Sequence, residues 1–257
     1  MLQRSHRLMP VSLLVIWAIQ SGENANAADA DDIQYGQFEL THTAAELLDA
    51  DTINTVSDFM DVNSDIVWQM YVPESYDPSA PAGLMVYISP SQRGLMPRRW
   101  RSVIDDKNLI WISANASGND EIVAKRMLYA VLAPQIATAS YRIDPDRVYL
   151  SGFSGGGKVS GMVAINFANM FKGAIYICGA EHWLEETPIE FAKVKENRYV
   201  FVTGTEDFNR DLSYKIYRKY QAAGVENVEL INVPRMGHSN PDTRYFLKAV
   251  NYLDQRE

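Results

Sequence analysis

The stretch RVYLSGFSGGGK, residues 147–158, decides the fold. Its first five residues are typical of a short strand, and residues 158–167 are small and apolar, as in a helix that packs closely on a sheet. Between them, glycines flank Ser154 and lack the Cβ atoms that would clash on a tight strand-to-helix turn. This G-x-S-x-G context predicts that the Ser154 hydroxyl projects above the sheet as a nucleophile.

The helix after Ser154 adds an electrostatic argument. Its N-terminal N–H groups and its dipole point at the serine, where they can stabilise a developing negative charge. The backbone N–H of Gly155, directly after the nucleophile, is therefore predicted to be one donor of an oxyanion hole.

The same stretch also fits the start of a phosphate-binding loop, G-x-x-x-x-G-K, over Gly152–Lys158. Such a loop needs serine or threonine next to hold magnesium, but Val159 stands there. Asp207 is the one acidic residue placed to bind the magnesium, and it fits better as the acid that orients a catalytic base. The sequence therefore disfavours a nucleotide-hydrolysing enzyme.

A nucleophilic serine needs a base, and the base needs an acid that orients it. His238 lies in Pro234-Arg235-Met236-Gly237-His238, directly after the last expected strand, and is the predicted base. Asp207, in Gly204-Thr205-Glu206-Asp207 after an earlier strand, is the predicted acid, with Glu206 as its neighbouring rival. His182 precedes both, so its order is wrong for a base; with Trp183 it is expected to line the substrate pocket.

Strands alternate with helices along the rest of the chain, which predicts a mostly parallel sheet of about eight strands with helices on both faces. One α/β domain over residues 34–257, without a large lid, is expected. Strands are predicted at 37–41, 66–72, 83–88, 109–113, 147–151, 174–178, 199–202 and 228–233, and helices at 121–141, 158–167, 212–221 and 242–253.

The N-terminus is typical of an export signal. Arg4 and Arg7 precede an apolar stretch of about a dozen residues, which is shorter than the roughly 20 that a membrane span needs. Ala25-Asn26-Ala27 then fits a small-x-small cleavage site. The prediction is a signal peptide at 1–27, a linker at 28–33, and a secreted or periplasmic protein without a membrane span.

Composition excludes several function classes. The net charge of -8 disfavours nucleic acid as a partner, and the basic run Arg98–Arg101 is expected to be the solvated start of a helix. Cys178 is the only cysteine, so no intramolecular disulfide forms, and its apolar surroundings predict a buried, inert thiol. The chain has four histidines but neither a CxxC nor an HExxH motif, so no metal or other cofactor is expected.

These motifs together resemble the α/β-hydrolase superfamily, over roughly residues 66–254. Ile143-Asp144-Pro145-Asp146-Arg147-Val148-Tyr149, before the serine, resembles the branch of polyhydroxybutyrate depolymerases and feruloyl esterases. The resemblance implies a carboxylic-ester hydrolase for small-molecule or polymer esters, in which Ser154, Asp207 and His238 are nucleophile, acid and base. A peptidase or amidase on the same fold, or a catalytically weak binding module, is the alternative.

One loop departs from the family pattern. Many members carry His-Gly after the third strand, where a backbone N–H completes the oxyanion hole, but this chain has Ser89-Pro90-Ser91-Gln92-Arg93-Gly94. Pro90 has no N–H to donate. The expected second donor is therefore the backbone N–H of Ser91 or Gln92, or the side-chain amide of Gln92.

Overall fold

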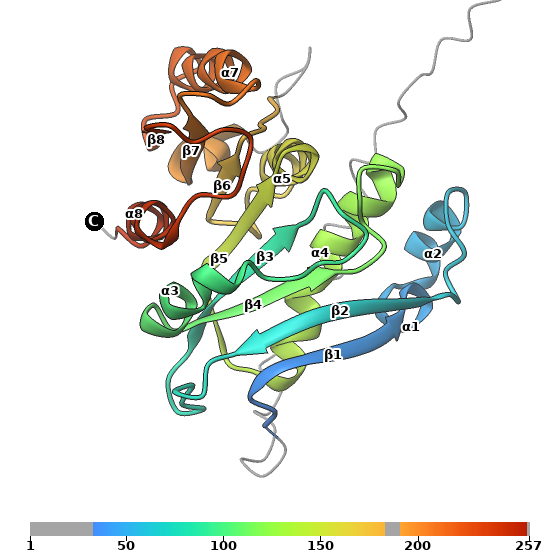
Figure 1. Ribbon diagram of the computed structural model, residues 1–257. Helices are drawn as coiled ribbons and strands as arrows, with labels where there is room; N and C mark the ends of the chain where they lie inside the picture. The colour runs from blue at the N-terminus through green and yellow to red at the C-terminus, as the bar shows by residue number, and fades with distance from the viewer. Residues whose placement is uncertain (1–32, 183–190, 256–257) are drawn as a thin grey trace, which may run out of the picture.

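The structure is a computed structural model that describes residues 33–182 and 191–255 (Figure 1). The expected signal peptide, nearly all of the expected linker, and Trp183 lie outside the described residues. In chain order the elements are β1 (Gly36–Thr43), α1 (Ala44–Leu47), α2 (Ala50–Val56), β2 (Asp65–Val72), β3 (Ala82–Ile88), the 3-10 helix η2 (Arg98–Trp100), α3 (Arg101–Asp106), β4 (Leu109–Ala114), α4 (Val123–Ser140), β5 (Ile143–Phe153), α5 (Gly155–Asn166), β6 (Gly173–Ile177), α6 (Phe191–Glu196), β7 (Arg198–Gly204), α7 (Arg210–Ala222), β8 (Val228–Val233) and α8 (Thr243–Leu253).

The described strands form one sheet of eight, in the order β1-β2-β4-β3-β5-β6-β7-β8. Strand β2 pairs antiparallel with β1 and with β4, and the other neighbouring pairs are parallel. The predicted α/β architecture with a mostly parallel sheet is confirmed. Because β3 to β8 run in one direction, the loops that follow them meet at one edge, where functional groups of such sheets gather.

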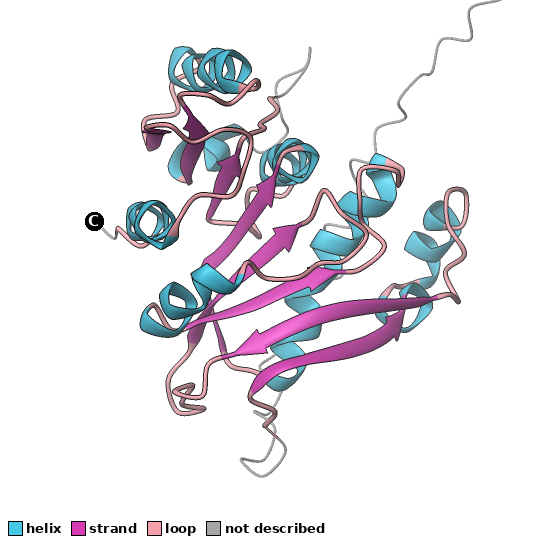
Figure 2. Ribbon diagram, viewed as in Figure 1, coloured by secondary structure: helices cyan, strands magenta, loops and turns pink. Residues whose placement is uncertain are grey.

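Each central strand is buried on both faces, as its continuous apolar sequence predicts. In β3, Leu84 and Val86 face a core that includes α4, α5 and α7, whereas Met85 and Tyr87 face a second core that includes α3 and α8. Figures 1 and 2 show α3 and α8 on one side of the sheet and α4 on the other. This sandwich holds the strand ends rigidly, which is what a catalytic site built on them needs.

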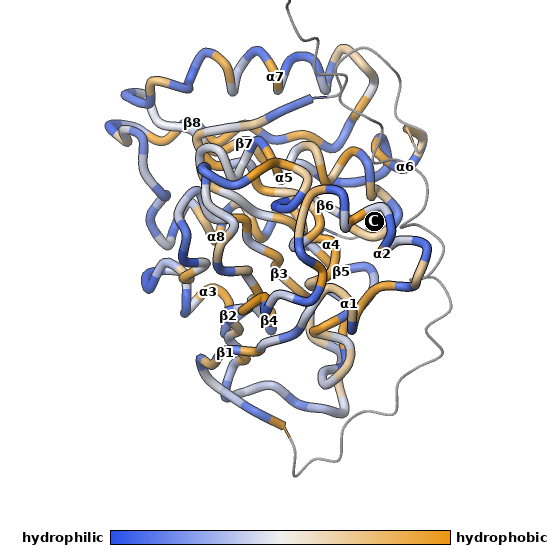
Figure 3. The backbone as a smooth tube through the Cα atoms, turned by 90° about the vertical axis from the view of Figure 1, so that its right-hand side faces the viewer, coloured by the Kyte–Doolittle hydropathy of each residue, from blue (hydrophilic) through white to orange (hydrophobic). Residues whose placement is uncertain are grey.

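Helix α7 shows how a surface helix covers the sheet. Hydrophilic and hydrophobic positions alternate along it (Figure 3), and Ile216 and Tyr220 are its large buried side chains. This 3.6-residue pattern is that of an amphipathic helix. Among the residues described, no helix combines the length and the apolar character that a bilayer crossing needs.

Trp100 corrects one expectation from the sequence. The basic run Arg98–Arg101 does begin a helical segment, but it is not wholly solvated, because Trp100 is fully buried. The Trp100 ring stacks on Phe246 with centroids 4.0 Å apart, and its Nε1 donates to the carbonyl of Pro241 at 3.0 Å. Trp100 therefore joins η2 to the start of α8.

Two short helices after β1 were missed by the sequence patterns. The Thr43 side chain accepts from the N–H of Glu46 and begins α1, with the Glu46 carboxylate returning to the N–H of Thr43 in a capping box. Asp49 caps α2 by accepting from the N–H of Thr52. Both helices are shorter than the window over which apolar periodicity is visible.

Candidate active site

Ser154 stands on a strained turn between β5 and α5. Its backbone has φ 55° and ψ −119°, a region that costs a non-glycine residue about 1–3 kcal/mol. The turn is held by the N–H of Ser154, which donates to the carbonyl of Ile177 at 2.8 Å. Gly156 permits the close approach of β3, because a Cβ atom there would lie 1.9 Å from the carbonyl oxygen of Ile88. The predicted strand–serine–helix turn is thus present in the structure.

A continuous chain of hydrogen bonds links the ends of three strands at this edge of the sheet. Nε2 of His238, in the loop after β8, lies 2.9 Å from Oγ of Ser154. Nδ1 of the same ring lies 2.7 Å from Oδ1 of Asp207, in the loop after β7. Glu206, the rival acid, is exposed, and its backbone N–H donates to Met236. The structure therefore brings together the three residues that the sequence selected.

The Asp207 carboxylate is almost fully buried and well supplied with donors. Besides His238, it accepts from Oγ1 of Thr203 at 2.7 Å and from the N–H of Asn209 at 3.0 Å. Burial alone raises the pKa of Asp207, but these hydrogen bonds, with a smaller contribution from the Cys178 thiol, outweigh it and leave the pKa lowered. Asp207 is consequently ionised at neutral pH.

The charge of Asp207 fixes the tautomer of His238. An ionised carboxylate only accepts hydrogen bonds, so Nδ1 of the imidazole carries the hydrogen that points at Asp207. In the neutral ring, Nε2 is then an acceptor, and the Ser154 hydroxyl is the donor that faces it. This is the polarity that general-base activation of a serine requires.

Two phenylalanines flank the imidazole. The Phe208 ring stacks on His238 with centroids 4.0 Å apart, and Phe153 lies at 4.9 Å. Phe208 is 77% exposed, the largest exposed fraction among the large hydrophobic side chains described. An exposed aromatic ring beside the reacting groups offers a surface for an apolar part of a substrate.

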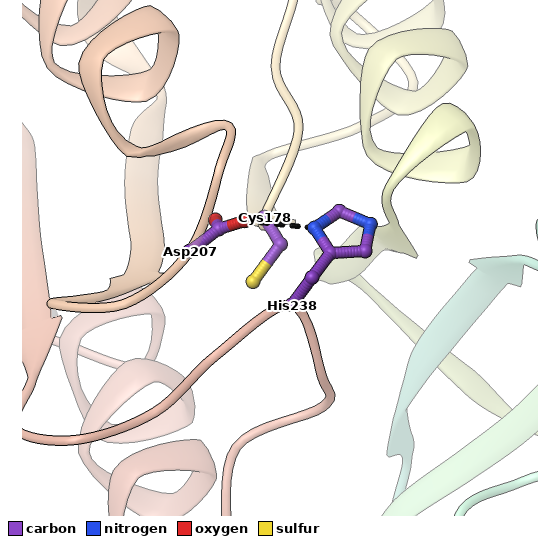
Figure 4. A group of neighbouring side chains, drawn as sticks. All are labelled: Cys178, Asp207 and His238. Carbon is purple, nitrogen blue, oxygen red and sulfur yellow. Dashed lines mark hydrogen bonds and ion pairs between the residues drawn. The ribbon is translucent and has the colours of Figure 1, made fainter.

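Cys178, Asp207 and His238 form a cluster whose potential ligand atoms lie within 4.8 Å of one another (Figure 4). The donor set does not suit a metal ion. Burial raises the pKa of the Cys178 thiol, which is fully buried. The facing atoms of Asp207 and His238 are already engaged with each other. The Cys178 thiol donates to the carbonyl of Ser239 at 3.5 Å, so this cluster is held by hydrogen bonds.

The predicted oxyanion donors have different surroundings. Gly155 is the first residue of α5, where backbone N–H groups have no partner within the helix. The N–H of Ser91 donates to Oγ of Ser89 at 3.0 Å, and the Gln92 side-chain amide lies 3.4 Å from Glu121. Of the three candidates from this turn, two are therefore engaged within the protein, and the backbone N–H of Gln92 is left.

His182 contacts helix α7 and its own neighbour in the chain. Its Nδ1 is 3.1 Å from the Glu181 carboxylate and its Nε2 is 2.5 Å from Nζ of Lys219. These contacts hold the ring against α7, whereas Trp183, its expected partner in the pocket wall, lies outside the described residues. Their role in substrate binding stays a prediction.

Sequence reasoning missed the residues that support the acid. The contact with Asn209 could have been predicted. An aspartate carboxylate commonly accepts a hydrogen bond from the backbone N–H two residues later in a turn. Thr203 lies inside strand β7. Because β-branched residues are common in strands, its sequence position does not indicate a contact with Asp207. Phe208 follows Asp207 directly, but nothing in the sequence indicates its exposure.

Comparison with known proteins gives the fold a name. No protein-family model and no curated protein matches the sequence. Solved structures do match. A ferulic acid esterase superposes with a TM-score of 0.59 at 15% identity, covering 86% of this chain and 99% of that one. A feruloyl esterase module from Clostridium thermocellum gives a TM-score of 0.60 at 13% identity, covering 85% and 88%.

An S-formylglutathione hydrolase from Staphylococcus aureus gives a TM-score of 0.59 at 11% identity, covering 86% of this chain and 99% of that one. At such identities the likeness concerns the fold. The chain shares the fold of these proteins, which is the α/β-hydrolase fold that the sequence motifs predicted.

Proposed function

We propose that this protein is an exported serine hydrolase that cleaves carboxylic esters, with Ser154 as nucleophile, His238 as base and Asp207 as the acid that orients the base. The observation that carries the proposal is the unbroken series of hydrogen bonds from Asp207 through His238 to Ser154. Such a series activates a serine hydroxyl, which is otherwise a weak nucleophile.

The reaction follows from these contacts. Oγ of Ser154 forms a bond to the ester carbonyl carbon, its proton passes to Nε2 of His238, and the carbonyl electron pair moves onto the oxygen, near the N–H of Gly155. The intermediate then breaks the carbon–oxygen bond to the alcohol, which takes the proton from His238. Water attacks the acyl-enzyme by the same route and releases the acid. No cofactor takes part in these steps.

The fold neighbours support an ester as the substrate, since two of the three structures above are named ferulic acid or feruloyl esterases. The exposed Phe208 beside His238 also favours an ester with an apolar group near its carbonyl. Small-molecule and polymer esters both remain within this class.

Export rests on the sequence of residues 1–27. The basic start, the short apolar stretch and Ala25-Asn26-Ala27 support cleavage that leaves a mature chain beginning near Ala28. N-terminal sequencing of the protein recovered from outside the cytoplasm tests this. A chain recovered there that still begins at Met1 would contradict it.

An ester panel tests the activity. The purified mature chain is assayed on esters with short and long acyl chains, on feruloyl and acetyl-sugar esters, and on peptide amides with matched leaving groups, with Ser154→Ala as the control. Ester turnover that the Ser154→Ala variant lacks supports the proposal. Faster turnover of amides than of matched esters indicates a peptidase or amidase, and absence of all turnover indicates a binding module.

A further inference from the structure

The oxyanion hole has one clear donor and needs a second. Two donors aimed at the developing charge are the usual requirement for acyl transfer, and Gly155 supplies one. Pro90 has no N–H, the N–H of Ser91 is engaged by Ser89, and the Gln92 side chain faces Glu121. Of the oxyanion donors that the sequence predicted in the turn after β3, only the backbone N–H of Gln92 is therefore left.

The loop after β4 lies over this turn and extends to the strand-to-helix turn that carries Ser154. The N–H of Asn119 donates to the carbonyl of Pro90 at 2.9 Å, and the N–H of Ala116 donates to the carbonyl of Gln92 at 2.7 Å. Gly118 allows the contact, because a Cβ atom there would lie 2.9 Å from the carbonyl carbon of Ser91. Asn119 is thus placed between the β3 turn and the start of α5.

The Asn119 side chain lies against Gly155. A Cβ atom at Gly155 would be 2.1 Å from Oδ1 and 3.1 Å from Nδ2 of Asn119. Gly155 must therefore be glycine for the carboxamide to occupy this position. Asn119 is exposed to solvent, and among the described residues no hydrogen bond of its side chain is found. The Asn119 carboxamide consequently lies beside Gly155, with Oδ1 nearer than Nδ2 to the position that a Cβ would take. Rotation of the amide by half a turn exchanges these two atoms.

A buried arginine fixes both loops. Arg126, on α4, donates through Nε to the carbonyl of Ser117 at 2.8 Å and through Nη2 to the carbonyl of Ser89 at 3.1 Å. Its side chain is buried, which lowers the pKa of the guanidinium without discharging an arginine at neutral pH. The two loops are therefore anchored to one rigid helix, as a preorganised site requires.

From this geometry we infer that Asn119 is a catalytic residue, whose Nδ2 donates the second hydrogen bond to the oxyanion beside the N–H of Gly155. The inference rests on the proposed ester hydrolysis at Ser154. The backbone N–H of Gln92 is the competing donor. A carboxamide is suited to the role, because its N–H groups donate hydrogen bonds that strengthen as negative charge develops on the carbonyl oxygen.

The test compares Asn119→Ala and the isosteric Asn119→Asp with Asp120→Ala, a change at an exposed neighbour on the same loop. With an ester that the wild type hydrolyses, Asn119→Ala is expected to lower kcat by about 10²-fold with little change in KM. Asn119→Asp is expected to lose at least as much, because a carboxylate repels the oxyanion. Asp120→Ala is expected to keep wild-type kinetics.

A trifluoromethyl ketone gives a second readout, because Ser154 adds to it and leaves a bound oxyanion. Asn119→Ala is expected to bind the ketone about 10²-fold more weakly than the wild type does. Asp120→Ala is expected to bind it with wild-type affinity. If kcat and ketone affinity in a folded Asn119→Ala or Asn119→Asp protein stay within about threefold of wild type, the donor is Gln92 and the inference fails. If the wild type hydrolyses no ester, the proposed function fails instead.

Discussion

Replacing Thr203 with valine tests whether buried hydrogen bonds keep Asp207 ionised. The Thr203 side chain is fully buried, and its Oγ1 donates to Oδ2 of Asp207 at 2.7 Å. Valine keeps the shape and removes the donor. Because a hydrogen bond to a charged group contributes about 1.5–3 kcal/mol, the free energy of unfolding at pH 7 is expected to fall by about 2 kcal/mol.

The sign of the pH dependence follows from the lowered pKa of Asp207. Its ionised carboxylate stabilises the fold fully above the unfolded-state pKa of about 3.9, and this stabilisation is lost as the pH falls through the folded-state pKa. Thr203→Val moves the folded-state pKa back up. The difference in the free energy of unfolding between variant and wild type is therefore expected to reach its full value of about 2 kcal/mol at pH 7 and to decrease below about pH 4.

Urea unfolding at several pH values measures this difference, with equal m-values as the sign that only stability has changed. Thr41→Val, an exposed threonine on β1, is the matched control and is expected to show no such pH dependence. A loss of stability in Thr203→Val that is the same at pH 3 as at pH 7 would mean that valine packs badly, and the hydrogen-bonding argument would be refuted.

Three further substitutions test other contacts. Gly156→Ala forces a Cβ atom to 1.9 Å from a backbone carbonyl, so the soluble yield and thermal midpoint are expected to fall sharply; a wild-type melting curve would contradict this. Trp100→Ala removes a buried ring and is expected to cost about 3–5 kcal/mol in urea unfolding, whereas Trp100→Phe is expected to cost less; equal costs would show that stacking contributes nothing. Asp207→Asn is expected to lower kcat by about 10⁴-fold in steady-state ester assays, since the amide favours the wrong imidazole tautomer; a loss below tenfold would separate Asp207 from the reaction.

Much of the fold could be predicted from the sequence because the central strands are buried on both faces. Their continuous apolar runs, such as Gly83–Ile88, stand out against the helices around them. The strand order could not be predicted, since it depends on which apolar runs pair in space. Trp100 was misjudged for a similar reason: its neighbours are arginines, and its partner Phe246 lies far along the chain.

The candidate site divides in the same way. Ser154, Asp207 and His238 could be selected because each follows a strand and their order fits the fold. The position of Asn119 against Gly155 could not, because it requires two loops from neighbouring strands to cross. The support that Thr203 gives to Asp207 depends on which way one strand residue faces, and a single threonine in a strand does not reveal it.

Covalent labelling of the wild-type chain with a fluorophosphonate is the most direct test of the proposed chemistry. Activated Oγ of Ser154 should attack phosphorus and expel fluoride, while His238 accepts the proton. We predict one adduct per chain in the intact mass, mapped by peptide fragmentation to the segment that contains Ser154, with none in Ser154→Ala. A folded wild-type chain that stays unlabelled, or labelling that persists in Ser154→Ala, would contradict the assignment of Ser154 as the nucleophile.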